Sequence, residues 1–188
     1  MKKILFFGDS LTAGYGLSDP KTQSFPALLA QKAKNEGIPF EYTNAGISGD
    51  TTISALLRLP KLLVKSYDIY VVALGANDML RGQSAQAISQ NLEQIISQIK
   101  YVHPLAKILL LGMELPTWIT ASRAIQYKDV YRKLADKHSL AFLPFLLEGV
   151  IGIRTLNLPD LVHPNAEGYQ QIAERVWPLL KSLSLHIR

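Results

Sequence analysis

The fold can be read outward from one stretch, Lys3-Ile4-Leu5-Phe6-Phe7-Gly8-Asp9-Ser10-Leu11. A short apolar run that ends at a glycine and a polar turn is typical of a buried parallel strand. Similar runs recur at Phe40 to Thr43, Ile69 to Leu74, Ile108 to Leu111 and Leu140 to Leu143. The sequence therefore predicts a sheet of about five parallel strands, with Ser10 in the turn that follows the first.

Segments with helical spacing separate these runs. The clearest is Ala87 to Val102, where apolar residues recur at intervals of three and four and form one face of a helix. Further helices are expected at Ser24 to Glu36, Thr51 to Val64, Ala121 to His138 and Ala166 to Leu183. The alternation of strands and helices predicts an α/β fold, a flavodoxin-like three-layer α/β/α sandwich formed by residues 1–188 as a single domain.

Composition excludes several classes of protein. Of 188 residues, 48% are hydrophobic, which is far from the composition of a disordered chain. The net charge is +5, but the Lys and Arg residues are scattered, so we expect no nucleic-acid partner. The absence of cysteine excludes disulfides and thiolate zinc sites.

Membrane insertion and export are not expected from this sequence. No run approaches the roughly 18 apolar residues that span a bilayer. The apolar run that follows Met1-Lys2-Lys3 ends at Gly8 after four residues, whereas a secretory signal needs about 7 to 15. The sequence as given therefore predicts a cytoplasmic protein, or a periplasmic one if the native precursor carries an export segment.

Polar groups follow the strands at four places. Ser10 follows the first strand, Gly46 to Asp50 the second, Gly75 to Asp78 the third, and Asp160 with His163 come after the fifth. Because the carboxyl ends of parallel strands meet at one edge of a sheet, these groups are expected to lie together. They are the parts of an acyl-transfer site.

Ser10 needs a base, and His163 is the histidine best placed to serve. Histidine titrates near neutrality and can take and return a proton. Asp160, three residues earlier, can accept a hydrogen bond from its ring, whereas His103, His138 and His186 have no such acidic motif. The alternative interpretation of this segment is a polar loop before a helix. A metal site is less well supported, because the sequence does not clearly offer the further His or carboxylate ligands that it would need.

A tetrahedral intermediate also needs donors for its oxyanion. Asn77 offers a side-chain amide, and Gly49 and Ser10 offer backbone N–H groups. Taken singly, such segments are ordinary turn chemistry, and it is their joint placement that favours a site. The sequence has no Gly-x-Ser-x-Gly elbow and no glycine-rich phosphate-binding motif, which disfavours an ordinary α/β-hydrolase and a nucleotide-binding protein.

The chain resembles the SGNH, or GDSL, hydrolase superfamily in four blocks: Gly8 to Tyr15, Asn44 to Thr51, Gly75 to Asp78 and Asp160 to Pro164. Shorter segments are similar to the bacterial multifunctional thioesterase, lysophospholipase and arylesterase branch: Leu59-Pro60, Leu80-Arg81-Gly82, Leu115-Pro116 and Leu143-Pro144-Phe145. One departure is Ala76, where close relatives often carry glycine. That difference bears on acyl-chain preference rather than on the chemistry.

The resemblance implies Ser10 as nucleophile, His163 as base and Asp160 as its orienting partner, with Ser10, Gly49 and Asn77 forming the oxyanion hole. It implies a serine esterase that acts on carboxylic esters or thioesters of acyl substrates, with no cofactor or metal. Candidates for an apolar substrate wall are Leu11, Leu80, Leu115 and Trp118.

Two other functions are compatible with parts of the same pattern. A carbohydrate O-acetyl esterase would use the same catalytic groups on a different substrate. A non-catalytic binding module that keeps the fold is disfavoured because every catalytic position is filled. The sequence leaves the oligomeric state open.

Overall fold

A computed structural model describes residues 1–113, 127 and 129–185. Its centre is a five-stranded sheet in the order β2-β1-β3-β4-β5, in which every pairing is parallel. The strands are β1 (Lys2–Gly8), β2 (Phe40–Gly46), β3 (Ile69–Ala73), β4 (Lys107–Leu111) and β5 (Ala141–Leu143). The predicted α/β fold with a parallel sheet is confirmed, and the strand order is that of flavodoxin-like folds.

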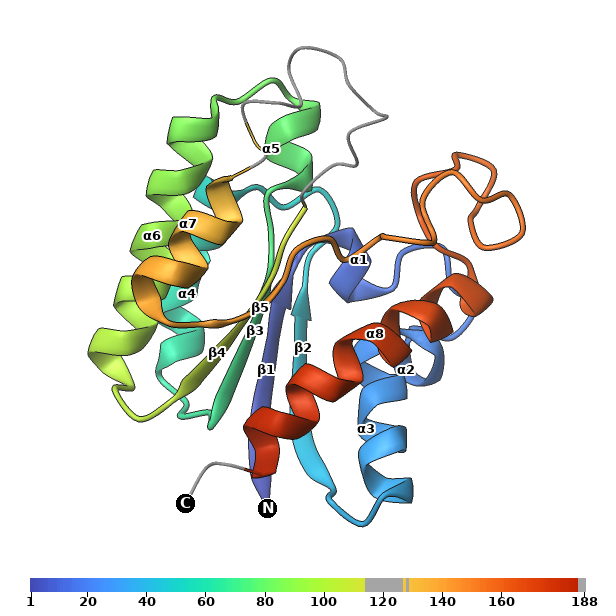
Figure 1. The fold of residues 1–188 in the computed structure, drawn as a ribbon, viewed down its shortest axis with the longest axis horizontal. Helices are drawn as coiled ribbons and strands as arrows, with labels where there is room; N and C mark the ends of the chain where they lie inside the picture. Colours follow the sequence, from blue (N-terminus) through green and yellow to red (C-terminus); the bar gives the residue numbers. More distant parts are fainter. Residues whose placement is uncertain (114–126, 128, 186–188) are drawn as a thin grey trace.

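Helices cover both faces of the sheet (Figure 1). The helices α3 (Phe25–Asn35) and α8 (Ala166–Leu185) pack together on one face, and α4 (Thr52–Leu63), α6 (Ala85–Val102) and α7 (Val130–His138) pack on the other. Three short helices complete the described chain: α1 (Ser10–Ala13), α2 (Pro20–Gln23) and α5 (Ala76–Leu80).

The long predicted helices are present with small shifts at their ends. The helix expected at Ala121 to His138 is described only from Val130, because residues 121–126 and 128 lie outside the described part of the chain. The short helices α1, α2 and α5 were not predicted from the sequence. Two of these, α1 and α5, carry Ser10 and Asn77.

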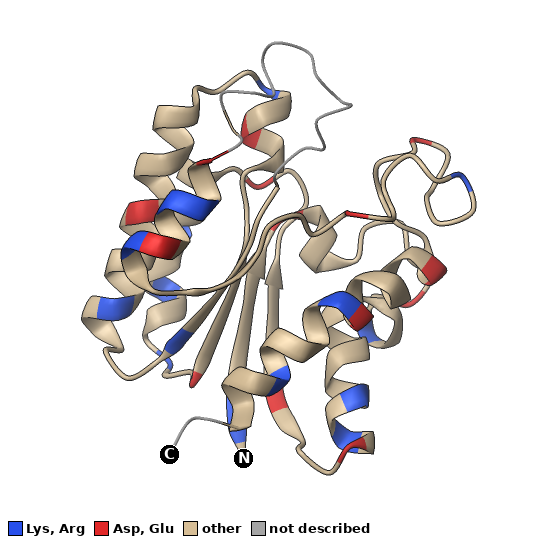
Figure 2. Cartoon of the chain, viewed as in Figure 1, with Lys and Arg blue, Asp and Glu red and all other residues tan. Residues whose placement is uncertain are grey.

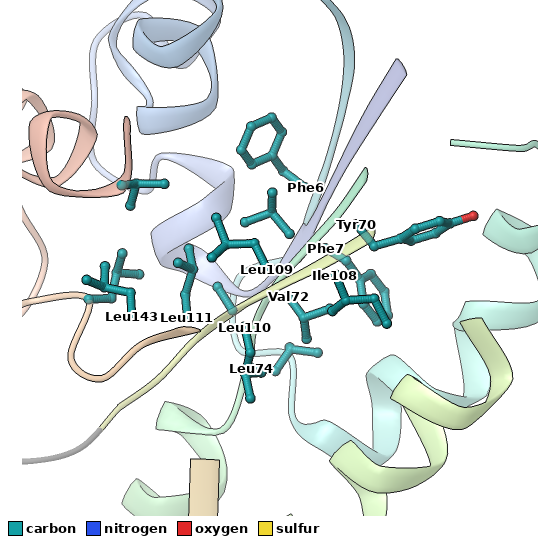
Figure 3. Packing of buried hydrophobic residues seen from close by; sticks show 14 of the residues in the cluster. Phe6, Phe7, Tyr70, Val72, Leu74, Ile108, Leu109, Leu110, Leu111 and Leu143 are labelled. Atoms are coloured by element: carbon teal, nitrogen blue, oxygen red, sulfur yellow. The ribbon is translucent and has the colours of Figure 1, made fainter. Parts of the chain in front are cut away.

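The core explains why the strand sequences are almost continuously apolar. Helices cover both faces of the sheet, so side chains on each side of a central strand need to be hydrophobic. Figure 3 shows Phe6, Phe7, Val72 and Leu110 packed among their neighbours, and all four are fully buried. This burial fixes the register of the strands, because a slip by one residue would exchange the two faces of a strand.

The polar groups predicted from the sequence follow β1 and the two strands beside it. β1 pairs with β2 on one side and with β3 on the other. Gly8 at the end of β1 is level with Gly46 of β2 and with Ala73 of β3. A Cβ on Gly46 would lie 2.2 Å from the backbone nitrogen of Ala13, so only glycine lets α1 pack directly on the end of β2. The contact places Ser10, the first residue of α1, over the carboxyl edge.

Lys and Arg residues, and Asp and Glu residues, are scattered over the helices and loops (Figure 2). Among the described residues, no helix has both the length and the hydropathy needed to cross a bilayer.

Candidate active site

A chain of hydrogen bonds joins Ser10, His163 and Asp160. The Ser10 Oγ lies 3.1 Å from His163 Nε2, and His163 Nδ1 lies 2.7 Å from Asp160 Oδ2. Ser10 and His163 are 153 residues apart in sequence, so the fold alone brings them together. A hydroxyl, an imidazole and a carboxylate in this order form the arrangement in which a serine can be activated as a nucleophile.

Asp160 is held as a carboxylate by its own turn. Its Oδ1 accepts the N–H groups of Val162 and His163 at 3.0 and 2.9 Å. Desolvation by itself raises the pKa of Asp160, but these backbone N–H groups and the His163 ring outweigh it and lower the pKa to about 2. Asp160 is therefore ionised at neutral pH and can orient the His163 ring.

The turn that carries Asp160 and His163 has an unusual backbone. Leu161, between them, has φ of 60°, a left-handed conformation that a leucine adopts rarely. The turn is braced from outside: the Gly152 N–H donates to the Leu161 carbonyl at 2.9 Å, and the Leu158 N–H donates to the His163 carbonyl at 2.8 Å. The ring of Tyr15 also lies 4.7 Å from the His163 ring. Such strain is tolerated where the surroundings over-determine the local geometry.

The structure brings the predicted oxyanion donors to the same edge. The Asn77 amide nitrogen donates to the Asp50 carbonyl at 3.0 Å and lies 3.4 Å from the carboxylate of Asp9, which precedes Ser10. Gly49 has φ of 80°, which glycine adopts freely. Within the described residues, neither the Ser10 nor the Gly49 N–H donates to a protein group.

Helix α5 is fastened to the segment that contains Gly49. The Arg81 guanidinium donates to the Gly49 carbonyl at 2.9 Å. The buried carboxylate of Asp78 accepts the Thr52 N–H at 2.8 Å and the Thr52 hydroxyl at 2.6 Å. Together with the bond from Asn77 to the Asp50 carbonyl, these contacts hold the two predicted oxyanion segments in a fixed relation.

A partly buried ion pair that was not predicted from the sequence supports this edge of the sheet. Arg58 of α4 contacts the Asp50 carboxylate at 2.7 Å, donates to the Gly8 carbonyl at 3.1 Å and lies over the Phe7 ring at 4.4 Å. Asp50 stood in one of the motif blocks, but nothing in the spacing marked Arg58, two turns along an amphipathic helix, as its partner.

Asp9 is a further buried carboxyl at the site, and it has no cationic partner in hydrogen-bonding contact among the described residues. Its Oδ1 accepts the Leu11 N–H at 3.0 Å and so caps α1. Burial, reinforced by the nearby charge of Asp50, raises the pKa of Asp9 to about 7, although the Leu11 N–H and His163 oppose the shift. No role for Asp9 beyond its place in the motif was predicted from the sequence.

The predicted apolar wall is only partly described. Leu11 is 3% exposed and packs in the core, so it has almost no surface to offer a ligand, whereas Leu80 is 78% exposed. Leu115 and Trp118 lie outside the described residues. Ile47, near Gly49, and Val162, next to His163, are exposed apolar residues. Neither was singled out from the sequence.

The part of the chain that the structure describes contains no group of three or more His, Asp or Glu side chains placed to hold a metal ion.

Comparison with known proteins decides the family. Residues 6–171 match the GDSL-like Lipase/Acylhydrolase family. The chain belongs to this family. It is a hydrolase of the SGNH type, as the four sequence blocks implied.

Individual relatives cover nearly the whole chain. Esterase TesA of Pseudomonas aeruginosa is 36% identical over 181 residues, which cover 96% of this chain and 88% of the relative. Thioesterase 1/protease 1/lysophospholipase L1 of Escherichia coli K12 is 35% identical over 97% of this chain and 85% of the relative. A crystal structure of TesA superposes with a TM-score of 0.89 at 36% identity and covers 97% of this chain and 99% of that one.

The buried Asp9 predicts a pH-dependent stability. The folded state raises the Asp9 pKa from 3.8 to about 7, so it favours the neutral carboxyl. Its contribution to stability is fully present below pH 4 and is lost as the pH rises through 7. The Asn side chain of Asp9→Asn cannot titrate. The Tm of this variant minus the Tm of the wild type should therefore rise by several degrees between pH 4 and pH 8. Thermal melts across this range test the sign, and a constant difference would contradict it.

The Asp50–Arg58 pair predicts a stability loss when one partner is removed. Arg58→Met leaves a buried carboxylate without its cation, which should lower the free energy of unfolding by about 3 kcal/mol. The single variant Asp50→Asn and the double variant Arg58→Met/Asp50→Asn complete the comparison. The double variant leaves no charge uncompensated, so its loss of unfolding free energy should be smaller than that of Arg58→Met alone. Urea unfolding of the four proteins measures this. If the double variant lost the sum of the two single losses, the pairing would be refuted.

Proposed function

We propose that this chain is a serine esterase that hydrolyses carboxylic ester or thioester bonds of acyl substrates through an acyl-enzyme. The observation that carries the proposal is the unbroken hydrogen-bonded series from Asp160 through His163 to Ser10. The free N–H groups of Ser10 and Gly49 and the amide of Asn77 support it, because they lie at the same sheet edge. The names of the relatives, an esterase and a thioesterase/lysophospholipase, favour the same substrate class.

In the first half-reaction, the Ser10 Oγ attacks the carbonyl carbon of the substrate while His163 Nε2 takes the hydroxyl proton. The ionised Asp160 stabilises the imidazolium that forms. The carbonyl oxygen becomes an oxyanion and accepts hydrogen bonds from the Ser10 and Gly49 N–H groups and from Asn77. When the tetrahedral intermediate collapses, the imidazolium gives its proton to the departing alcohol or thiol, and the acyl group remains on Ser10.

In the second half-reaction, water attacks the acyl-enzyme. His163 takes a proton from the water, and the same donors stabilise the second oxyanion. Collapse breaks the bond between the acyl carbon and Ser10 Oγ, His163 returns the proton to Ser10, and the carboxylic acid departs. Every proton transfer is made by His163, so this scheme uses only groups of the chain and water.

The substrate class is tested by kinetics on p-nitrophenyl esters from acetyl to palmitoyl, with an acyl-CoA series beside them. Turnover should extend to medium acyl chains, because exposed apolar side chains such as Leu80 and Ile47 stand on the loops of the site. Hydrolysis confined to acetyl groups, with acetyl-xylan preferred over an octanoyl ester, would favour a carbohydrate O-acetyl esterase instead.

Removing the proposed nucleophile or base should abolish turnover without unfolding the chain. Ser10→Ala and His163→Ala should each lower kcat by roughly 10⁴-fold or more. His138→Ala is the matched control, because His138 pairs with Glu93 on the helical layer and contacts none of the proposed catalytic groups. Full activity in either variant, or loss in His138→Ala alone, would refute the assignment.

Asn77 separates stabilisation of the oxyanion from stabilisation of the fold. If its amide donates to the developing oxyanion, Asn77→Ala should lower kcat by roughly 10² to 10³-fold with little change in KM. Asp78→Ala removes the acceptor of two Thr52 bonds from the same helix, so it should lower Tm more and kcat less. Retained kcat with a lower Tm in Asn77→Ala would make Asn77 a structural residue.

A further inference from the structure

The carboxyl of Asp9 lies between two N–H donors that belong to different parts of the site. Its Oδ1 accepts the Leu11 N–H at 3.0 Å, and its Oδ2 lies 3.4 Å from the amide nitrogen of Asn77. Asp9 is 1% exposed, so its oxygens depend on protein donors. The first contact begins the helix that carries Ser10, and the second reaches the proposed oxyanion donor.

The two hydrogens of the Asn77 amide are held differently. One is directed to the Asp50 carbonyl at 3.0 Å, which is an ordinary hydrogen-bond length, and anchors the amide. The other faces Asp9 Oδ2 at 3.4 Å, which is longer than the usual range of about 2.7 to 3.2 Å. The second N–H is therefore held only weakly.

We propose that Asp9 is a positioning residue that orients the second Asn77 N–H in the resting enzyme and releases it to the oxyanion in the transition state. The inference rests on the proposed esterase function. A donor fixed before the reaction stabilises a developing charge without the cost of reorganisation. The weak contact with Asp9 provides that fixation, because a stronger acceptor would compete with the oxyanion for the same hydrogen.

The electrostatics of Asp9 agree with this role. A fully charged carboxylate so close to the oxyanion would oppose it. Burial and the charge of Asp50 raise the Asp9 pKa to about 7, while the Leu11 N–H and His163 act in the other direction. Burial, and to a lesser degree the charge of Asp9, raises the pKa of the Tyr131 and Tyr169 phenols. Near neutral pH Asp9 therefore carries less than a full charge on average, which reduces the repulsion, while its ionised share still offers both oxygens as acceptors.

Substitution by asparagine separates the two contacts of Asp9. An asparagine has one carbonyl oxygen for two donors, so it can cap Leu11 or accept from Asn77, but not both. Asp9→Asn should therefore lower kcat by roughly 10- to 100-fold, with KM nearly unchanged and with Tm at pH 8 no lower than that of the wild type. Asp9→Ser, which keeps a capping oxygen but is too short to reach Asn77, should show the same loss.

The decisive experiment is a double-mutant cycle with Asn77→Ala. If Asp9 acts through Asn77, the double variant Asp9→Asn/Asn77→Ala should have a kcat within about 3-fold of Asn77→Ala alone, because the contact is already gone. Asp19 provides a matched control: its carboxylate caps α2 through the Lys21 N–H at 3.2 Å, in the same i to i+2 pattern, without contacting the site. Asp19→Asn should leave kcat unchanged and show no coupling to Asn77.

Two outcomes would overturn the inference. One is a double variant whose loss equals the product of the two single losses, and the other is full kcat in a folded Asp9→Asn or Asp9→Ser. Failure of the wild-type protein to hydrolyse any ester or thioester would instead refute the proposed function, and that result is visible before the cycle begins.

Discussion

The register of three parallel strands is the constraint on which the site depends. Gly8, Gly46 and Ala73 are level with one another, so the turns that follow β1, β2 and β3 start at the same height. Burial on both faces of the sheet fixes that register. The sheet thus aligns the turns that carry Ser10, Gly49 and Asn77. The turn with Asp160 and His163, which comes later in the chain, then needs only to place the His163 ring against Ser10.

Three carboxyls of the site lie in different surroundings. Asp160 is held ionised by N–H donors, with a pKa lowered to about 2, and faces the ring that accumulates positive charge. Asp50 is buried but compensated by Arg58. Asp9 is buried without such compensation, and its pKa is raised to about 7. In the proposed mechanism, this arrangement puts an ionised carboxylate beside the imidazole and lowers the average charge of the carboxyl beside Asn77, the proposed oxyanion donor.

The fold and the main groups of the site could be predicted from local sequence, because strand burial and strand-end turns leave strong signals. Apolar runs marked the strands, and Asp160 with His163 was recognisable from spacing. Arg58 left no signal, because its contacts with Asp50 and Gly8 depend on how α4 packs under the sheet edge. The burial of Leu11 and the raised pKa of Asp9 are likewise products of tertiary packing.

The central claim is that the fold activates one serine, and covalent labelling tests it most directly. The protein would be reacted with a fluorophosphonate, and the adduct would be located by peptide mapping in the wild type and in His163→Ala. The account predicts rapid labelling of Ser10 alone, and its loss when His163 is removed, since Ser10 is the only serine in the described part of the chain with a hydrogen bond to an imidazole, and it lies beside the proposed oxyanion donors. An adduct on Ser48 or another serine, or Ser10 labelling that does not need His163, would contradict it.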